Sequence, residues 1–211
     1  MDKLSVVVTG ASGLLGRQVF SSLKERGHNG KSKLDGENAV ISSGLSNYLI
    51  MRVPILYGKI QFLTESSVDS LLKNVLDSKA KKETSNQFKK FKADVFQVRY
   101  PTCVDDVARV LCDISEKRII HSQSTINGIA QFSAKTKMTK YEMCLTFSSS
   151  LGIDGDELFV PDTPVSGQTE IDRPENCQLS TKALEDWGID VSYTDFNKWW
   201  STHIKNNSYL I

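Results

Sequence analysis

Short apolar runs alternate with helical repeats along this chain in the order expected of a parallel α/β fold. Residues 4–9 (LSVVVT) form a valine-rich run, the pattern of a fully buried parallel strand. Leucine, valine and phenylalanine then recur at helical spacing over 14–23. The segment 30–40 is polar and helix-like, and 48–53 (YLIMRV) predicts a second buried strand. The start of the chain is therefore predicted to run strand, helix, helix, strand.

The rest of the chain continues the alternation. Helices are predicted over 65–78, 104–117 and 180–187, and a last one from about Thr194. The first of them has a cap at Ser66 or Ser67, and a further helix is opened by a Thr139/Glu142 capping box. Strands are predicted over 94–99 and 128–134. A loop that carries Pro161, Pro164 and Pro174 is expected before the last two helices. The lysine-rich 79–92 (KAKKETSNQFKKFK) is expected to be a solvated loop, with a patch for RNA or an acidic partner as the alternative.

Composition and charge exclude several classes of protein. The chain has 211 residues, the size of one domain or one and a half. Its 26 Lys+Arg against 25 Asp+Glu give a net charge of +1, which argues against a dedicated nucleic-acid binder. No segment approaches the roughly 18 uninterrupted apolar residues of a membrane span. The N-terminus lacks the apolar core of a signal peptide and the four cysteines are scattered, so we expect free thiols and a cytoplasmic location.

A glycine turn joins the first predicted strand to the first predicted helix. Gly10, Gly13 and Gly16 are spaced as Gly-x-x-Gly-x-x-Gly. In that position the first glycine permits a tight turn, the second lets the backbone approach a pyrophosphate, and the third lets helix and strand pack closely. The pattern favours a dinucleotide site, and a glycine-rich connection without a ligand is the alternative.

The second strand that a complete dinucleotide fold requires is missing. Such a fold needs a second strand that ends, about 20 positions on, in a residue that holds the ribose. The segment after Gly27 is polar and helix-like instead, and Asp35 and Glu37 lie inside it. Neither acid is expected to bind the ribose, and about half of a doubly wound sheet is absent.

Six segments together resemble a known family. They are VVVTGASGLLGRQV at 6–19, GKSKLDGENAV at 30–40, MRVPILYG at 51–58, RYPTCVDDVARV at 99–110, MTKYEM at 138–143 and RPENCQLSTKALEDWGI at 173–189. In this order they resemble the extended short-chain dehydrogenase/reductase family, and more narrowly its dTDP-4-dehydrorhamnose reductase-like branch. Within that branch they are most similar to the regulatory beta subunits of methionine adenosyltransferase.

The resemblance implies a fold class and a division of the chain. The expected class is α/β, with a truncated NAD(P)-binding Rossmann-like parallel sheet and a small C-terminal α/β substrate-type region. Residues 1–60 would be the incomplete nucleotide-binding part, and 61–211 the remaining Rossmann elements with the C-terminal region. Family members carry a long segment between the first helix and the GKSKLDGE helix, whereas here the two are fused near Asn29.

The resemblance also implies that reductase chemistry is lost. Family reductases use Tyr-x-x-x-Lys, in which the tyrosine protonates the substrate carbonyl oxygen and the lysine lowers the tyrosine's pKa. The lysine corresponds to Lys33, and Asn29 stands at the position of the tyrosine. An amide cannot donate that proton, so no catalytic residue is expected. The residues implied for cofactor binding are Gly10, Ser12, Gly13, Leu14, Leu15, Gly16 and Lys33, and NADP binding through so few of them is expected to be weak or lost.

Two further groups of residues follow from the resemblance. Arg173 and Asn176 belong to a loop that lines the sugar-nucleotide pocket in the reductase branch. Tyr209, Leu210 and Ile211 would be the apolar anchor of a C-terminal tail that engages the catalytic subunit of methionine adenosyltransferase. The preferred hypothesis is a non-catalytic regulator of S-adenosylmethionine synthesis; an NADP-dependent nucleotide-sugar reductase and a degenerate fragment without function are the alternatives.

Overall fold

The structure is a computed structural model that describes residues 29–85, 87–123, 125–163 and 175–207. Contacts along the chain divide it into two compact units, Met1–Ile50 and Met51–Ile211, and each is described here by itself. The strand predicted at 4–9, the glycine turn and the helix predicted at 14–23 lie outside the described residues.

The described part of the first unit is mainly one helix. Helix α2 (Asn29–Ser42) confirms the helix predicted over 30–40. Its apolar residues Leu34 and Ile41 are exposed. Strand β1 (Leu49–Arg52) confirms the strand predicted over 48–53 and crosses the boundary between the two units.

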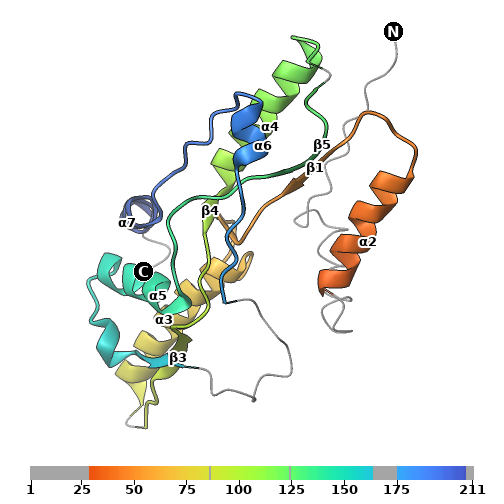
Figure 1. The fold of residues 1–211 in the computed structure, drawn as a ribbon. Helices are drawn as coiled ribbons and strands as arrows, with labels where there is room; N and C mark the ends of the chain where they lie inside the picture. The colour runs from red at the N-terminus through yellow and green to blue at the C-terminus, as the bar shows by residue number, and fades with distance from the viewer. Residues whose placement is uncertain (1–28, 86, 124, 164–174, 208–211) are drawn as a thin grey trace. The chain divides into compact units, whose positions relative to one another are not determined.

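The second unit contains pairs of strands joined by helices, as Figure 1 shows. Strand β2 (Leu56–Tyr57) lies parallel to β4 (Thr102–Cys103), and β3 (Phe91–Asp94) lies parallel to β6 (Phe159–Asp162). The third pair is β1 with β5 (Gly128–Gln131), where the Phe132 N–H donates to the Arg52 carbonyl at 3.0 Å. Parallel strands need crossover connections, which helices supply here. The predicted α/β class is confirmed.

Helix α5 packs on the β3–β6 pair and contacts two further helices. Helix α3 (Ser67–Thr84) contacts α5 (Lys140–Ser150), and α5 contacts both β3 and α7 (Phe196–Asn206) (Figure 1). A short 3-10 helix, η1 (Gly155–Glu157), precedes β6. The largest fully buried side chains of this core include Trp200, Tyr57, Phe147, Phe159, Phe196 and Leu72.

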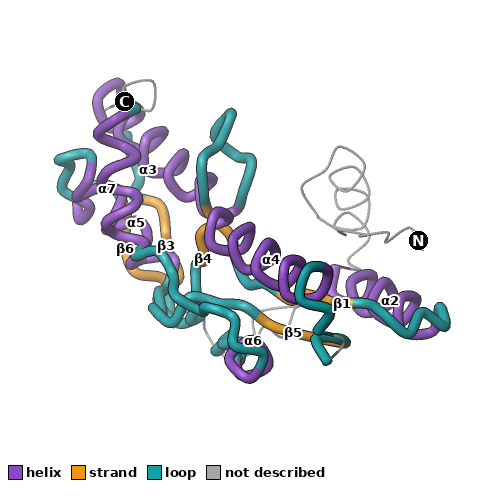
Figure 2. Tube along the Cα trace, turned by 90° about the horizontal axis from the view of Figure 1, so that it is seen from above, coloured by secondary structure: helices purple, strands orange, loops and turns teal. Residues whose placement is uncertain are grey.

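The other two helices belong to the β4 and β5 side of the unit. Helix α4 (Val104–Ile119) follows directly from β4 and confirms the helix predicted over 104–117. Helix α6 (Lys182–Asp186) lies beside β5, as Figure 2 shows from above. The helix predicted near 180–187 is confirmed, and Gly188 ends it with φ +64°, a left-handed conformation that glycine adopts at low cost.

The helix starts follow the predicted caps. The Ser66 hydroxyl accepts hydrogen bonds from the N–H groups of Val68 and Asp69 at the start of α3. The Thr139 side chain and Glu142 form the predicted capping box at the start of α5. Both motifs satisfy N–H groups that a helix cannot pair by itself, so the local sequence alone sets these boundaries.

The predictions for 79–92 and 94–99 were wrong. Helix α3 continues to Thr84, and β3 begins at Phe91 rather than at Asp94. Phe91 packs on Phe159 with ring centroids 5.3 Å apart. This contact places the start of the strand three residues before the start that alternation predicted. The alternation was misleading because lysines flank Phe91 and interrupt the apolar pattern.

The prediction of a loop was also wrong at Pro161, which lies in β6 opposite Ala93. Proline lacks an N–H but keeps its carbonyl. On either side of it, Phe91 and Val95 donate their N–H groups to the carbonyls of Leu158 and Asp162, each at 3.2 Å. Since β6 accepts at these positions, proline is tolerated there.

Candidate functional site

The described residues include few of the predicted site residues. The glycine turn 10–16, Arg173 and the tail 209–211 lie outside them. Lys33 is exposed on α2, in the first unit. One exposed lysine does not make a dinucleotide site. The assignments to cofactor and partner stay predictions.

Asn176 lies where the chain leaves the predicted sugar-nucleotide loop. It forms a parallel bridge with Val98, whose N–H donates to the Glu175 carbonyl at 2.7 Å. The Asn176 side-chain oxygen accepts from the N–H of Gln178 at 3.0 Å. The exposed Asn176 therefore helps to hold the end of the loop in place. This does not test its predicted role in a pocket.

A groove of about 670 Å³ runs along α7. Lys59, from the segment after β2, forms one part of its wall. The other lining residues come from α7 and the residues on either side of that helix: Thr194, Asp195, Lys198, Trp199, Thr202, His203, Asn206 and Asn207. The tail is predicted to cover about 201–211, and the structure places its first six residues in α7, so part of the groove lining belongs to it.

Aromatic side chains form the wall behind the groove. The Tyr57 ring meets Phe196 and Trp199 edge-on, with centroids 5.0 and 5.2 Å apart. Trp199 and Trp200 also meet edge-on at 4.9 Å, and the His203 ring stacks on Trp199 at 4.5 Å. Phe196 and Trp200 of α7 are buried in the core, while Trp199 is half-buried and lines the groove.

Two polar contacts fix the start of α7. The Tyr57 hydroxyl donates to the Thr194 carbonyl at 3.1 Å. The Asp106 carboxylate accepts from the Thr194 N–H at 2.7 Å and from its hydroxyl at 3.1 Å. Burial, and after it the charges of nearby acidic groups, raises the pKa of Tyr57, which keeps its hydroxyl a donor.

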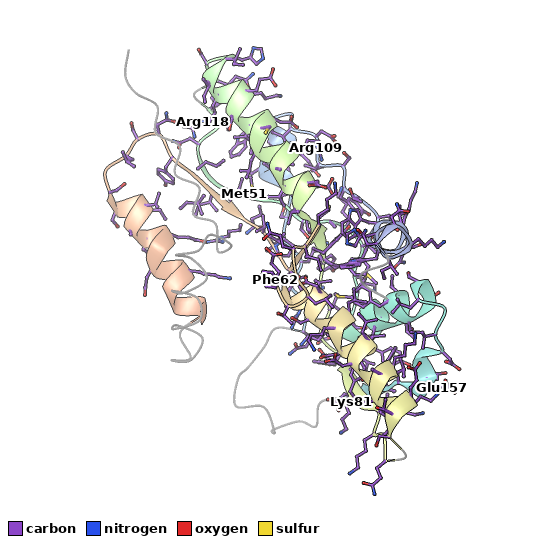
Figure 3. The ribbon with its side chains drawn as sticks, turned by 180° about the vertical axis from the view of Figure 1, so that it is seen from behind. Met51, Phe62, Lys81, Arg109, Arg118 and Glu157 are labelled. Atoms are coloured by element: carbon purple, nitrogen blue, oxygen red, sulfur yellow. The ribbon has the colours of Figure 1, made fainter. Side chains whose placement is uncertain are left out.

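Helix α4 holds the segment that leads into α7. Arg109, on α4 in Figure 3, donates to the carbonyls of Asp190 and Ser192 at 2.9 and 2.6 Å. Lys117 donates to the carbonyls of Trp187 and Gly188 at 3.0 and 2.8 Å. These long-range hydrogen bonds could not be predicted from the sequence. They set the position of α7, and with it the groove.

Asp105 and Asp106 both lie in the first turn of α4, where acidic side chains favour the helix start. Asp106 has the additional role of binding Thr194, which sequence reasoning missed. In the residues that the structure describes, no group of three or more His, Cys, Asp or Glu side chains could hold a metal ion. None of the helices in this same part of the chain has the length and apolar character needed to cross a membrane.

The lysine-rich segment 79–92 is partly neutralised within the fold. Lys82 pairs with Glu157, and Lys92 with Asp162 at 3.4 Å; Figure 3 shows Glu157 and Lys81 at one end of the second unit. Its two aromatic residues, Phe88 and Phe91, are half-buried and pack against the core. Both findings weaken the alternative of a patch that stacks RNA bases on exposed rings.

The asparagine beyond α7 fixes the hydrogen bonding of His203. The Asn207 amide nitrogen donates to the His203 carbonyl at 2.6 Å and lies 3.3 Å from Nδ1 of its ring. The nitrogen that meets the carbonyl must be the NH₂ group, and its second hydrogen is available to Nδ1. Burial, and after it the positive charge of Lys59, lowers the pKa of His203, which favours the neutral ring.

Comparison with known proteins places this architecture in a family. Residues 26–205 match the model of the RmlD substrate binding domain. The chain is 37% identical to "Methionine adenosyltransferase 2 subunit beta" of Rattus norvegicus over 161 residues, 76% of this chain and 44% of that protein. For the protein of the same name in Danio rerio, identity is 35% over 79% of this chain and 48% of the relative. The chain thus spans about half the length of the curated relatives it matches.

Solved structures give the same fold. A dTDP-4-dehydrorhamnose reductase from Clostridium acetobutylicum superposes with a TM-score of 0.60 at 22% identity, covering 84% of this chain and 55% of that one. The corresponding reductase from Bacillus anthracis, solved in complex with NADP, gives a TM-score of 0.62 at 16% identity, covering 85% and 55%. At these identities the likeness concerns the fold alone.

Proposed function

Because the chain belongs to the RmlD substrate-binding domain family, we propose that it is a non-catalytic regulatory subunit of methionine adenosyltransferase. In this role it binds the catalytic subunit and modulates S-adenosylmethionine synthesis in the cytoplasm. The observation that carries the proposal is the match to the beta subunits, which extends over three quarters of this chain. The reductases supply only a shared fold at lower identity.

The residues at the start of α2 support a non-catalytic role. Asn29 opens this helix and Lys33 lies four residues later, so the two positions share one face. Lys33 takes the place of the family lysine, and the amide of Asn29 is too weak an acid to transfer a proton as the tyrosine hydroxyl does. We propose that hydride transfer to a nucleotide-sugar ketone is lost.

The ligand sites belong to the same proposal. NADP, if bound, would be held by the glycine turn 10–16 with Lys33, weakly because the second strand is absent. Arg173 and Asn176 would line a remnant of the sugar-nucleotide pocket in the part assigned to 61–211. Tyr209, Leu210 and Ile211 would anchor the tail on the catalytic subunit.

A calorimetric titration of the chain into the methionine adenosyltransferase catalytic subunit tests the proposal. We expect saturable binding and a changed rate of S-adenosylmethionine formation. Leu210→Asp should weaken binding at least tenfold, whereas the matched change Leu34→Asp, at an exposed position of α2, should leave it unchanged. Absence of binding by a chain that melts cooperatively would overturn the regulatory function, and oxidation of NADPH with a nucleotide-sugar ketone would favour the reductase.

A further inference from the structure

Strand β3 pairs along one edge, with β6, and no other strand in the described part of the chain pairs with it. Figure 2 shows the two strands side by side. The N–H groups of Phe91 and Val95 donate to carbonyls at the two ends of β6, each at 3.2 Å. Backbone groups alternate in direction along a strand, so those of Lys92 and Asp94 point away from β6. This outer edge of β3 presents donors and acceptors to which a further strand can bind.

The outer edge of β6 is protected by a proline. The carbonyls of Leu158 and Asp162 accept from β3, so the backbone of Pro161, between them, faces the opposite way. Proline has no N–H, and this edge therefore lacks a donor that an added strand would need. Of the two outer edges of this pair, the edge of β3 is the one suited to strand addition.

The side chains of β3 alternate between apolar and charged. Phe91 and Ala93 pack against the core, and Ala93 is buried. Lys92 and Asp94 lie on the opposite face, where the Lys92 side chain is 72% exposed and pairs with Asp162 of β6 at 3.4 Å. The exposed face of the strand thus carries opposite charges two residues apart.

This pattern is self-complementary in an antiparallel pair. When Ala93 of two copies stand opposite each other, Lys92 of each copy lies opposite Asp94 of the other. These are the residues whose backbone groups point outward, so each such pair can exchange both of its N–H···O=C bonds. A shift of two residues in either direction would instead place lysine opposite lysine or aspartate opposite aspartate, which is unfavourable.

We propose that the outer edge of β3 pairs antiparallel with the same edge of a second copy of this chain, about a two-fold axis that passes between the two Ala93 residues. The second copy is the occupant because its own strand supplies the opposite charge at both Lys92 and Asp94. The interface is small, so the dimer is weak and depends on concentration. The pairing goes beyond the proposed function, since it involves neither the predicted tail nor the catalytic subunit.

Sedimentation equilibrium of the full chain at several concentrations tests the pairing. We expect an equilibrium between monomer and dimer. Lys92→Asp places like charges opposite each other in both pairs and should raise the dissociation constant about tenfold, and Asp94→Lys should do the same. A mixture of the two variants should form a heterodimer as well as the native chain forms its dimer, because every pair then joins an aspartate to a lysine.

Two further variants serve as controls. The Asp94 carboxylate also accepts from the N–H groups of Phe96 and Gln97 at 2.9 and 3.2 Å, so Asp94→Lys changes the turn after the strand as well. The chain that combines Lys92→Asp with Asp94→Lys loses the same turn contacts but restores opposite charges, and it should dimerise again. Lys182→Asp on α6 is the matched charge reversal. Lys182 is also 72% exposed and paired with an aspartate, and its replacement should leave the dimer unchanged.

Four outcomes would overturn the pairing. A native chain that stays monomeric up to about 1 mM has no such interface. A Lys92→Asp variant that dimerises more strongly than the native chain would make Lys92 a charge that keeps strands away from the edge. An equal loss of dimer in Lys182→Asp would indicate association through net charge alone. A mixture that stays monomeric, although both variants melt cooperatively, would exclude this register.

Discussion

The two sides of the second unit are packed to different degrees. Around β3 and β6, the helices α3, α5 and α7 bury large side chains completely, and Trp200 and Phe147 have no exposed surface. Around β5 and α4, Ile120 is 69% exposed and Ile129 is 39% exposed. Strands of a doubly wound sheet are ordinarily covered on both faces. In β5, Ala130 is buried while its neighbour Ile129 is not, so only one face of this strand is covered.

The comparison shows that the two sides differ in how fully they bury apolar surface. The β3–β6 side draws on elements from both halves of the chain, from α3 to α7, and its aromatic core is closed. The exposed Ile120 and Ile129 leave apolar surface on the β5 side, and exposed apolar surface of this kind favours association with other chains.

Truncation in the well-packed side should have the largest effect. Trp200→Ala removes a fully buried ring that contacts Phe147 at 4.9 Å and Trp199 at the same distance. We expect a loss of about 3–5 kcal/mol in the free energy of unfolding. Urea denaturation followed by circular dichroism measures it. The control Leu145→Ala, at a half-exposed position of α5, should cost less than about 1 kcal/mol; equal losses would mean that α7 does not pack as described.

Two glycines compare the tight packing of the β3–β6 side with an open helix position in the first unit. A Cβ added at Gly155 would lie 2.7 Å from the Phe159 ring and 2.8 Å from the Ser148 hydroxyl, whereas at Gly36 on α2 nothing lies within 4 Å. Gly155→Ala should therefore destabilise the protein by about 1–3 kcal/mol through overpacking. Gly36→Ala should instead favour the helix by up to about 1 kcal/mol, read from helical content. Loss of stability in both variants would show that the added methyl group is costly whatever its surroundings.

Surface apolar residues on the β5 side should matter for association rather than for folding. Ile120→Lys changes an exposed residue directly after α4, so the free energy of unfolding should change by less than about 0.5 kcal/mol. Binding of a dye that senses exposed apolar surface should fall, and light scattering at high concentration should fall with it. A large loss of stability would show that Ile120 is covered in solution.

Local sequence features predicted most elements, and long-range contacts account for the failures. The capping motifs at Ser66 and Thr139 each lie within a single helix start, so they could be recognised. Strand β3 was misplaced because its burial depends on Phe159, far along the chain. The groove could not be predicted at all. It depends on the bond of Asp106 to Thr194, and the sequence pattern contains no information on such pairs.

The smallest expected effect concerns acid stability at the groove. The pKa of His203 in the folded protein lies below its value of 6.5 in an unfolded chain, through burial first and Lys59 second. The unfolded state therefore binds the proton more readily, and acid favours unfolding. The contribution of the neutral ring is fully present above about pH 6.5 and is lost as the pH falls below it.

His203→Phe removes this titration while keeping a ring over Trp199. Melting temperatures of the native chain and the variant should therefore diverge as the pH is lowered from about 7.5 to about 5.5, with the native chain losing more. Lys59→Glu should narrow the difference, because it replaces the positive charge that disfavours protonation with a negative one. Parallel melting curves at every pH would mean that burial does not lower the pKa of His203 in the folded protein.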